Sequence, residues 1–125
     1  MSGTYRITVE GDFSSAHELR DYEGKCSSLH GHNWKVQLTV RALRVDERGI
    51  TIDFGQLKRL LAELIGRYDH VHLNQTPPFD KLNPTAENIA RTLYQAAREE
   101  LPEGVEVDKV VIWESDKNRV EYGEG

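Results

Sequence analysis

An alternation of apolar and polar side chains through residues 33–45 constrains the fold of this chain more than any other feature. The apolar positions share one parity: Trp34, Val36, Leu38, Val40 and Ala42. Successive side chains of a strand point to opposite faces of a sheet, so the pattern predicts a long strand with one buried face. His30 and His32 share the parity of these apolar positions. We therefore expect both imidazoles to begin the buried row of this strand.

Three further segments have the pattern of strands. Residues 4–10 alternate in the same way, and we expect residues 13–19 to continue that strand after a bulge at Gly11 and Asp12. Residues 105–113 are rich in valine and predict a third strand. A short turn then leads to a last strand at residues 119–122.

Two segments have the spacing of helices. Asp53 followed by Gln56 is typical of a capping box, and leucine and isoleucine side chains then recur at helical spacing as far as Ile65. Thr85 is a typical N-cap for a second helix, which Pro102 ends. The order strand, strand, helix, helix, strand, strand predicts an α+β fold, with antiparallel hairpins and both helices on one face of the sheet.

Size and charge limit the functions expected of this chain. Its 125 residues predict a single domain, residues 1–125. The net charge of −5 argues against sequence-independent nucleic-acid binding, and the apolar runs are far too short to cross a membrane, so we expect neither partner. The N-terminus lacks the pattern of a secretion signal, and one cysteine cannot form an internal disulfide. These features predict a cytoplasmic protein.

Histidine and cysteine side chains near the N-terminus have the spacing of a metal site. His30 and His32 would direct both imidazoles to one face, and His17 would supply a third nitrogen from a neighbouring strand. Three neutral imidazoles with an open fourth position are the ligand set of a catalytic zinc. Cys26 lies in a polar segment, where Lys25 and a nearby cation would both favour the thiolate. We therefore expect a Zn²⁺ site beside a reactive sulfur; the alternative is polar loop histidines and a small buried thiol.

Asp69, His70 and Glu114 are candidates for other roles. His70 lies in a predicted loop, residues 69–84, and an aspartate beside a histidine typically orients the imidazole for proton transfer. The alternative is a structural loop histidine, which is what we expect of His72. Glu114 ends a nearly all-apolar strand, where it is either a solvated strand end or an acceptor of two hydrogen bonds from an amidine-like ring edge. The sequence contains no Gly-x-Ser-x-Gly elbow and no glycine-rich phosphate loop.

Six motifs occur along nearly the whole chain in an order that one known family shares. They are Phe13–His17 (FSSAH), Cys26–Asn33 (CSSLHGHN), Ile52–Lys58 (IDFGQLK), Tyr68–Asn74 (YDHVHLN), Asn83–Asn88 (NPTAEN) and Trp113–Glu114. In this combination the sequence resembles the family of 6-pyruvoyl-tetrahydropterin synthases and 6-carboxytetrahydropterin synthases. The three residues between Cys26 and His30 are similar to the bacterial 6-carboxytetrahydropterin synthase branch, because the animal branch has a longer insert there.

The resemblance implies a metal centre and its base. His17, His30 and His32 match the zinc ligands of the family. Cys26 matches the catalytic thiol that acts as the general base.

The resemblance also implies roles for residues in the second half of the chain. Asp69 and His70 match the dyad that relays protons. Glu114 matches the carboxylate that anchors the pterin ring. Thr85 and Glu87 fall in a motif that lies near the pterin pocket.

A fold and a reaction are implied by the same resemblance. The fold is the tunnelling fold (T-fold), a four-stranded antiparallel sheet with two helices on one face, in the order ββααββ. Members assemble as homo-hexamers of two stacked trimers, with active sites at subunit interfaces. The implied reaction converts 7,8-dihydroneopterin triphosphate to 6-carboxy-5,6,7,8-tetrahydropterin with release of acetaldehyde and triphosphate, in queuosine (7-deazaguanine) biosynthesis. Candidates for holding the triphosphate are Arg6, Lys25, Lys35, Lys117 and Arg119.

Three alternatives stay open from the sequence. Within the family, the chain is alternatively a 6-pyruvoyl-tetrahydropterin synthase. From another class, it is a non-catalytic zinc-binding scaffold that uses the same oligomer for partner contact. A zinc hydratase or hydrolase would use zinc-bound water as its nucleophile and would depend on neither Cys26 nor Glu114.

Overall fold

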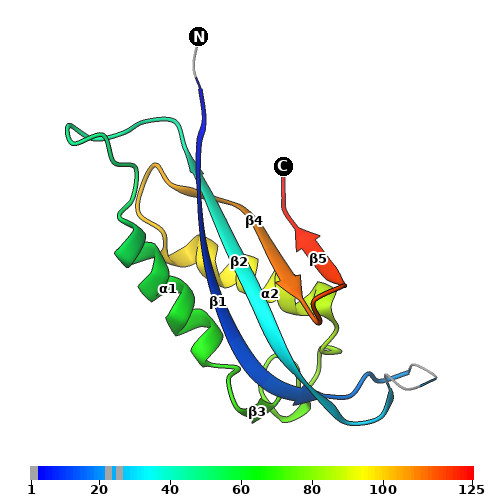
Figure 1. The fold of residues 1–125 in the computed structure, drawn as a ribbon. Coiled ribbons are helices and arrows are strands. Elements are labelled where there is room, and N and C mark those ends of the chain that lie inside the picture. Colours follow the sequence, from blue (N-terminus) through cyan, green and yellow to red (C-terminus); the bar gives the residue numbers. More distant parts are fainter. Residues whose placement is uncertain (1–2, 22–23, 25–26) are drawn as a thin grey trace.

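The hairpin of β1 and β2 is the longest feature of the structure, a computed structural model that describes residues 3–21, 24 and 27–125. In chain order the elements are β1 (Tyr5–His17), β2 (His30–Ala42), α1 (Phe54–Gly66), β3 (Val71–His72), the 3₁₀ helix η2 (Leu73–Gln75), α2 (Ala86–Glu100), β4 (Glu106–Trp113) and β5 (Arg119–Tyr122). Figure 1 shows the hairpin running the length of the sheet. Across the described ranges, no helix is long and apolar enough to cross a membrane.

The five strands form a mixed sheet in the order β3-β1-β2-β4-β5. The pairs β1–β2, β2–β4 and β4–β5 are antiparallel, whereas β3 pairs parallel to β1 through Ser15↔Val71 and Ala16↔His72. The predicted α+β class and its two helices are therefore confirmed. The predicted four-stranded antiparallel sheet in the order ββααββ is not, because two residues of the predicted loop 69–84 join the edge of β1. β3 has only two residues and is defined by its backbone pairing with β1, so the sequence has no alternation that would predict it.

Gly11 differs from its predicted role. The predicted bulge is absent, since β1 pairs with β2 in unbroken register from Tyr5↔Ala42 to His17↔His30. A Cβ atom at Gly11 would lie 2.8 Å from Cδ1 of Ile65 in α1, so the glycine allows the helix to approach the sheet closely. The one register shift in the pairs of the described sheet lies between β2 and β4, at Thr39 and Val40.

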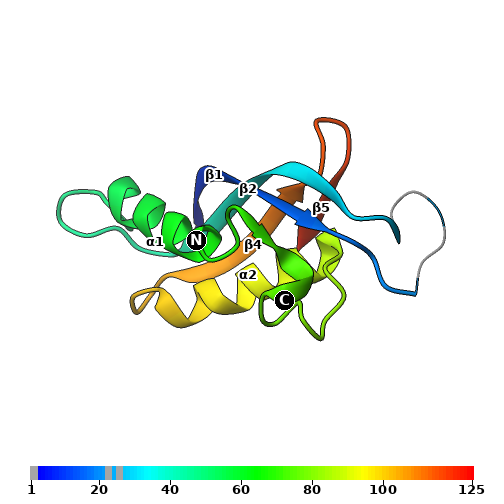
Figure 2. The same cartoon turned by 90° about the horizontal axis from the view of Figure 1, so that it is seen from below.

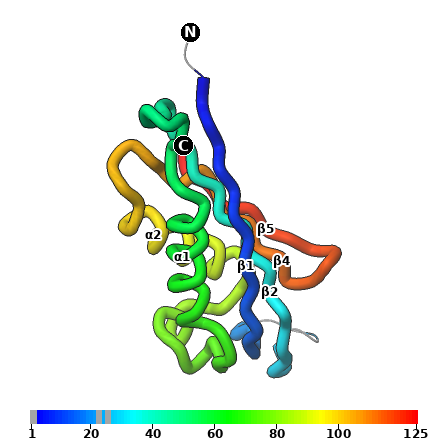
Figure 3. Tube along the Cα trace, turned by 60° about the vertical axis from the view of Figure 1, so that its left-hand side comes forward, coloured from blue at the N-terminus to red at the C-terminus, as the bar shows by residue number. Residues whose placement is uncertain are grey.

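Both helices cover the same face of the sheet, as Figures 2 and 3 show. Their predicted caps are confirmed: the Asp53 carboxylate accepts a hydrogen bond from the Gln56 amide, and the Thr85 hydroxyl accepts one from the Asn88 amide. The buried leucine and isoleucine side chains of the helices share one core with the predicted apolar row of β2, all of which is buried: Trp34, Val36, Leu38, Val40 and Ala42. This row forms the middle of the core and leads directly to the histidines at the start of β2.

Candidate metal centre

Three histidines converge where β1 ends and β2 begins. His17 pairs with His30 across the hairpin, and His32 pairs with Ser15 on the same face. One ring nitrogen from each imidazole can be chosen so that the three atoms all lie within 4.8 Å of one another. His17 is 1% exposed, while His30 and His32 are half-buried. The structure therefore brings together the three residues that the sequence predicted as metal ligands.

Two backbone carbonyls fix which nitrogen of each ring carries the proton. The Nδ1 atom of His17 lies 2.7 Å from the carbonyl oxygen of Pro84, and Nδ1 of His30 lies 2.5 Å from that of Ser28. A carbonyl only accepts hydrogen bonds, so Nδ1 must be the protonated nitrogen in both rings. In the neutral rings each Nε2 then carries a lone pair and no proton. This is the tautomer in which a histidine binds a metal through Nε2 while a partner holds Nδ1.

The two free nitrogens face each other. Nε2 of His17 lies 3.2 Å from Nε2 of His30. Two lone pairs at this distance repel unless a cation is shared between them. Two nitrogens at about 2.0–2.1 Å from a tetrahedral zinc would lie ~3.3 Å apart, which is close to the observed separation.

Burial favours a metal over a proton as the shared cation. Burial lowers the pKa of His17, and the neighbouring His30 lowers it further, although the bond to Pro84 opposes the shift. Burial also lowers the pKa of His32, with Glu114 opposing. Both rings therefore stay neutral at neutral pH, as metal ligands must be.

The Nε2 atom of His32 is a second indication that these histidines bind a cation. Its Nε2 atom is buried and has no hydrogen-bond partner among the described residues. Such orphaned buried atoms are rare in folded proteins and call for an ion or water. Trp34, which is fully buried, packs edge-on against His17 and His32, with ring centroids 5.0 and 5.1 Å away. The donor set and its apolar wall fit a zinc ion.

Glu114 is the one predicted pterin-binding residue that lies against the histidines. It follows β4, and its Oε1 atom lies 3.7 Å from Nε2 of His32. Its side chain is 32% exposed, so one carboxylate can face both the metal centre and solvent. Thr85 and Glu87 have no hydrogen bond to the three histidines in the described chain. The Thr85 hydroxyl caps α2, and Glu87 is exposed in the first turn of that helix.

The predicted dyad is formed, and His70 lines the same shallow cavity as His32 at the edge of β1. Oδ1 of Asp69 lies 2.9 Å from Nδ1 of His70 and accepts a hydrogen bond of 2.9 Å from the Ser14 amide. The Ser14 bond lowers the pKa of Asp69, and His70 lowers it further. His70 has a left-handed backbone, φ 57°, and its amide donates to the Ser14 carbonyl. Its side chain is 81% exposed at the edge of the sheet, so in one chain the dyad faces solvent.

Other predicted residues are placed less fully. Cys26 and Lys25 lie outside the described residues, so the role of the thiol stays a prediction. His72, expected to be structural, follows the dyad in β3 and has a buried Nε2 with no hydrogen-bond partner among the described residues.

The sequence did not predict the roles of the Pro84 and Ser28 carbonyls, because every residue has a backbone carbonyl and a residue pattern cannot single one out. The only signal for Pro84 was its place in the motif Asn83–Asn88.

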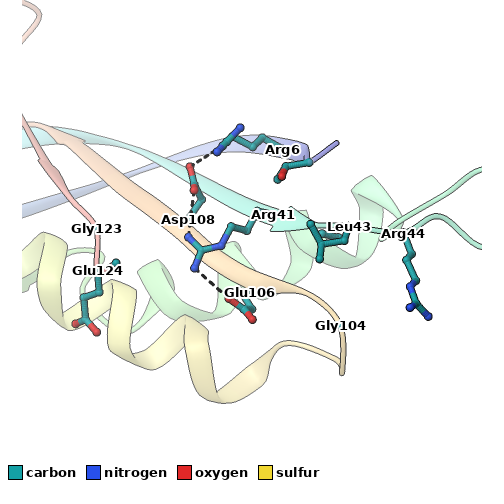
Figure 4. Close-up of a pocket in the computed structure, with 12 residues that line it drawn as sticks. Arg6, Arg41, Leu43, Arg44, Gly104, Glu106, Asp108, Gly123 and Glu124 are labelled. Carbon is teal, nitrogen blue, oxygen red and sulfur yellow. Dashed lines mark hydrogen bonds and ion pairs between the residues drawn. The ribbon is translucent and has the colours of Figure 1, made fainter. Parts of the chain in front are cut away.

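Arg6, a candidate for holding the triphosphate, lies too far from the three histidines to act at the candidate metal centre of its own chain. The pairs Arg6↔Arg41 and His17↔His30 lie at opposite ends of the hairpin. Eleven residues at about 3.3 Å each separate them by ~36 Å. Figure 4 shows Arg6 and Arg41 in a hollow at this far end, paired with Asp108 at 3.4 and 3.3 Å.

This chain is similar to known proteins along nearly its whole length. The sequence model of the 6-pyruvoyl tetrahydropterin synthase family matches residues 6–125. A 6-carboxy-5,6,7,8-tetrahydropterin synthase of Bacillus subtilis is 33% identical over 96 residues, which cover 73% of this chain and 64% of that protein. A dihydroneopterin monophosphate aldolase of Pyrococcus furiosus is 30% identical over 116 residues, which cover 93% of this chain and 95% of that protein.

The fold is also that of a solved member of the family. The structure of Caenorhabditis elegans 6-pyruvoyl tetrahydropterin synthase superimposes with a TM-score of 0.86 at 25% sequence identity, over 99% of this chain and 98% of that one. The match of nearly the whole chain in sequence and in structure, together with the three histidines, leads to one conclusion. This chain belongs to the 6-pyruvoyl tetrahydropterin synthase family.

Proposed function

We propose that this protein is a zinc-dependent lyase that converts 7,8-dihydroneopterin triphosphate to 6-carboxy-5,6,7,8-tetrahydropterin. One water is consumed, acetaldehyde and triphosphate are the other products, and the pathway is queuosine (7-deazaguanine) biosynthesis. One observation carries the proposal: two imidazoles whose Nδ1 atoms are bound to carbonyls direct unprotonated Nε2 atoms at each other, 3.2 Å apart. The short spacing of Cys26 and His30 and the relative in Bacillus subtilis favour the carboxy branch.

Four residues of this chain would bind the metal and the pterin ring. His17, His30 and His32 would hold the zinc, which supplies a Lewis acid for the adjacent hydroxyls of the substrate side chain when it is bound. Glu114 would accept two hydrogen bonds from the amidine-like edge of the pterin ring.

Proton transfer is assigned to three other residues. Cys26 would remove a proton from the substrate as a thiolate. His70, held by Asp69, would donate one from the opposite side.

We propose a homo-hexamer of two trimers with active sites between subunits. The outer edge of β1 before Ser15 and the edge of β5 have no partner strand in the described sheet. Open edges at both sides of a sheet can pair between copies. The exposed dyad supports this arrangement, because the His70 side chain is 81% exposed at the edge of the sheet, where a neighbouring subunit could cover it.

Product analysis tests the reaction. Zinc-loaded protein supplied with 7,8-dihydroneopterin triphosphate is expected to release acetaldehyde, and elemental analysis is expected to find one zinc per chain. Release of triphosphate without acetaldehyde would instead indicate the 6-pyruvoyl branch. If Cys26→Ala kept every function, the non-catalytic scaffold would replace the enzyme.

A second candidate follows from one comparison. The Pyrococcus furiosus aldolase matches nearly the full length of both chains, which the Bacillus subtilis synthase does not. An aldolase acting on dihydroneopterin monophosphate would cleave a carbon–carbon bond and leave the phosphate on the aldehyde product. Turnover of the monophosphate, with a phosphorylated aldehyde released and the triphosphate left unchanged, would favour this candidate.

A further inference from the structure

The segment that follows β1 is hydrogen-bonded as though the strand continued, but its partners are asparagine side chains. The Glu18 amide donates to Oδ1 of Asn74 at 2.9 Å, and Nδ2 of Asn74 donates back to the Glu18 carbonyl at 2.9 Å. The Arg20 amide donates to Oδ1 of Asn83 at 2.8 Å, and Nδ2 of Asn83 donates back to the Arg20 carbonyl at 3.2 Å. A carboxamide offers an acceptor and donors as a peptide group does, so each asparagine imitates one residue of a neighbouring strand.

The Arg20 side chain ties the same segment to the loop before α2. Its guanidinium donates to four backbone carbonyls, those of Asn74, Phe79, Asp80 and Leu82, at 3.3, 2.7, 3.3 and 3.2 Å. The planar guanidinium has five donors in a fixed geometry, which lysine cannot reproduce. The loop is therefore held to the chain three residues beyond His17.

These hydrogen bonds connect Arg20 and Asn83 to the carbonyl that binds His17. Asn83 precedes Pro84, whose carbonyl accepts the Nδ1 proton of His17 at 2.7 Å. The Asn83 carbonyl itself accepts hydrogen bonds from Nδ2 of Asn88 and from the Thr85 amide, at 2.9 and 2.8 Å. The Pro84 carbonyl is thus fixed from the side of α2 and from the side of Arg20.

We propose that Arg20 and Asn83 are positioning residues for the metal centre. They hold the Pro84 carbonyl where it keeps His17 in the Nδ1-protonated tautomer and aims Nε2 at the shared cation. Neither residue reaches the cation itself. Partners that orient a metal-binding histidine typically change metal affinity by 10–100-fold when they are removed. This inference rests on the proposed metal site, and the two measurements below distinguish its failure from the failure of the proposed function.

Metal affinity is the first measurement. Arg20→Lys keeps the charge but loses the planar donors, and Asn83→Ala loses both hydrogen bonds to Arg20. The matched control is Arg48→Lys, because Arg48 lies in an exposed turn and pairs only with Asp46 in the described chain. The Zn²⁺ dissociation constant, measured by competition with a chromophoric chelator on proteins shown to be folded, is expected to rise 10–100-fold in both variants. The control is expected to stay within twofold of the parent.

The tautomer of His17 is the second measurement, and it needs no metal. Nitrogen-15 NMR of the zinc-free parent is expected to show the Nδ1-protonated form, and the two variants a mixture of both tautomers. Zinc affinity within twofold of the parent, together with an unchanged tautomer, would overturn the inference. If Asn83→Ala does not fold, Arg20→Lys decides alone. If the parent binds no zinc, the proposed function fails, and the tautomer measurement still decides the role of Arg20 and Asn83.

Discussion

Replacing His30 with alanine tests the metal centre most directly. The variant keeps two of three ligands and removes the nitrogen that lies 3.2 Å from Nε2 of His17. A ligand that binds only the folded state at 100 times its Kd stabilises by ~2.7 kcal/mol. For a chain of this size, at about 3–4 °C per kcal/mol, that is a rise in Tm of about 8–11 °C. The parent is therefore expected to show this rise on addition of zinc, and His30→Ala is expected to show almost none.

Thermal unfolding with zinc and with EDTA, together with elemental analysis, measures the effect. The zinc-free variant is expected to be no less stable than the zinc-free parent, because it loses a repulsion between two facing lone pairs. His70→Ala is the matched control, since it removes an exposed imidazole and should keep the full zinc-dependent rise. A His30→Ala protein that still holds about one zinc per chain would refute the ligand assignment.

Three further predictions concern the dyad, the pH dependence and the packing. Asp69→Asn should keep the bound zinc but lower kcat by about 10²–10⁴-fold, because the amide oxygen still accepts from the Ser14 amide but the imidazole of His70 loses its carboxylate partner; unchanged turnover in a steady-state assay would remove the dyad from the mechanism. Protons compete with zinc for the ligand nitrogens, and the pKa values of two ligands are lowered by burial. The zinc affinity, measured by chelator competition, should therefore stay constant as the pH falls to the ordinary pKa of histidine and should decrease only below that pH. A decrease that begins above pH ~7 would contradict the lowered pKa values. Gly11→Ala should destabilise by less than about 1 kcal/mol in urea unfolding, because the atom that its Cβ meets is the terminal methyl of Ile65, which can rotate away. Gly66→Ala, with nothing within 4 Å, is the control, and a loss of about 3 kcal/mol in Gly11→Ala alone would show that Ile65 has no room to move.

The strand parity and the helix caps could be predicted from the sequence because they depend on local chemistry. The buried row of β2 carried His30 and His32 to the correct face, and Asp53 and Thr85 began the two helices as predicted. Each of these features follows from the spacing of residues within one element. The sequence also predicted that His17 would come from a neighbouring strand, but its pairing with His30 is known only from the register of the hairpin.

Features that depend on contacts between distant segments could not be predicted. β3 exists because its backbone pairs with β1, 56 residues away at Ser15↔Val71, and its two residues are too few to show alternation. Gly11 looked like a strand interruption because the sequence does not show that α1 passes over it. The carbonyls that orient His17 and His30 are backbone atoms, which any residue would supply, so only the folded loop reveals them.

The hollow at the far end of the hairpin allows stability to be changed separately from the candidate metal site. Arg6 and Arg41 line it and pair with Asp108, ~36 Å from the imidazoles by the length of the hairpin. Substitutions at distant sites with no shared partners usually have additive effects on stability. The ion pairs of this hollow can therefore be varied to raise or lower the stability of the sheet without altering β1 and β2 where they carry the three histidines.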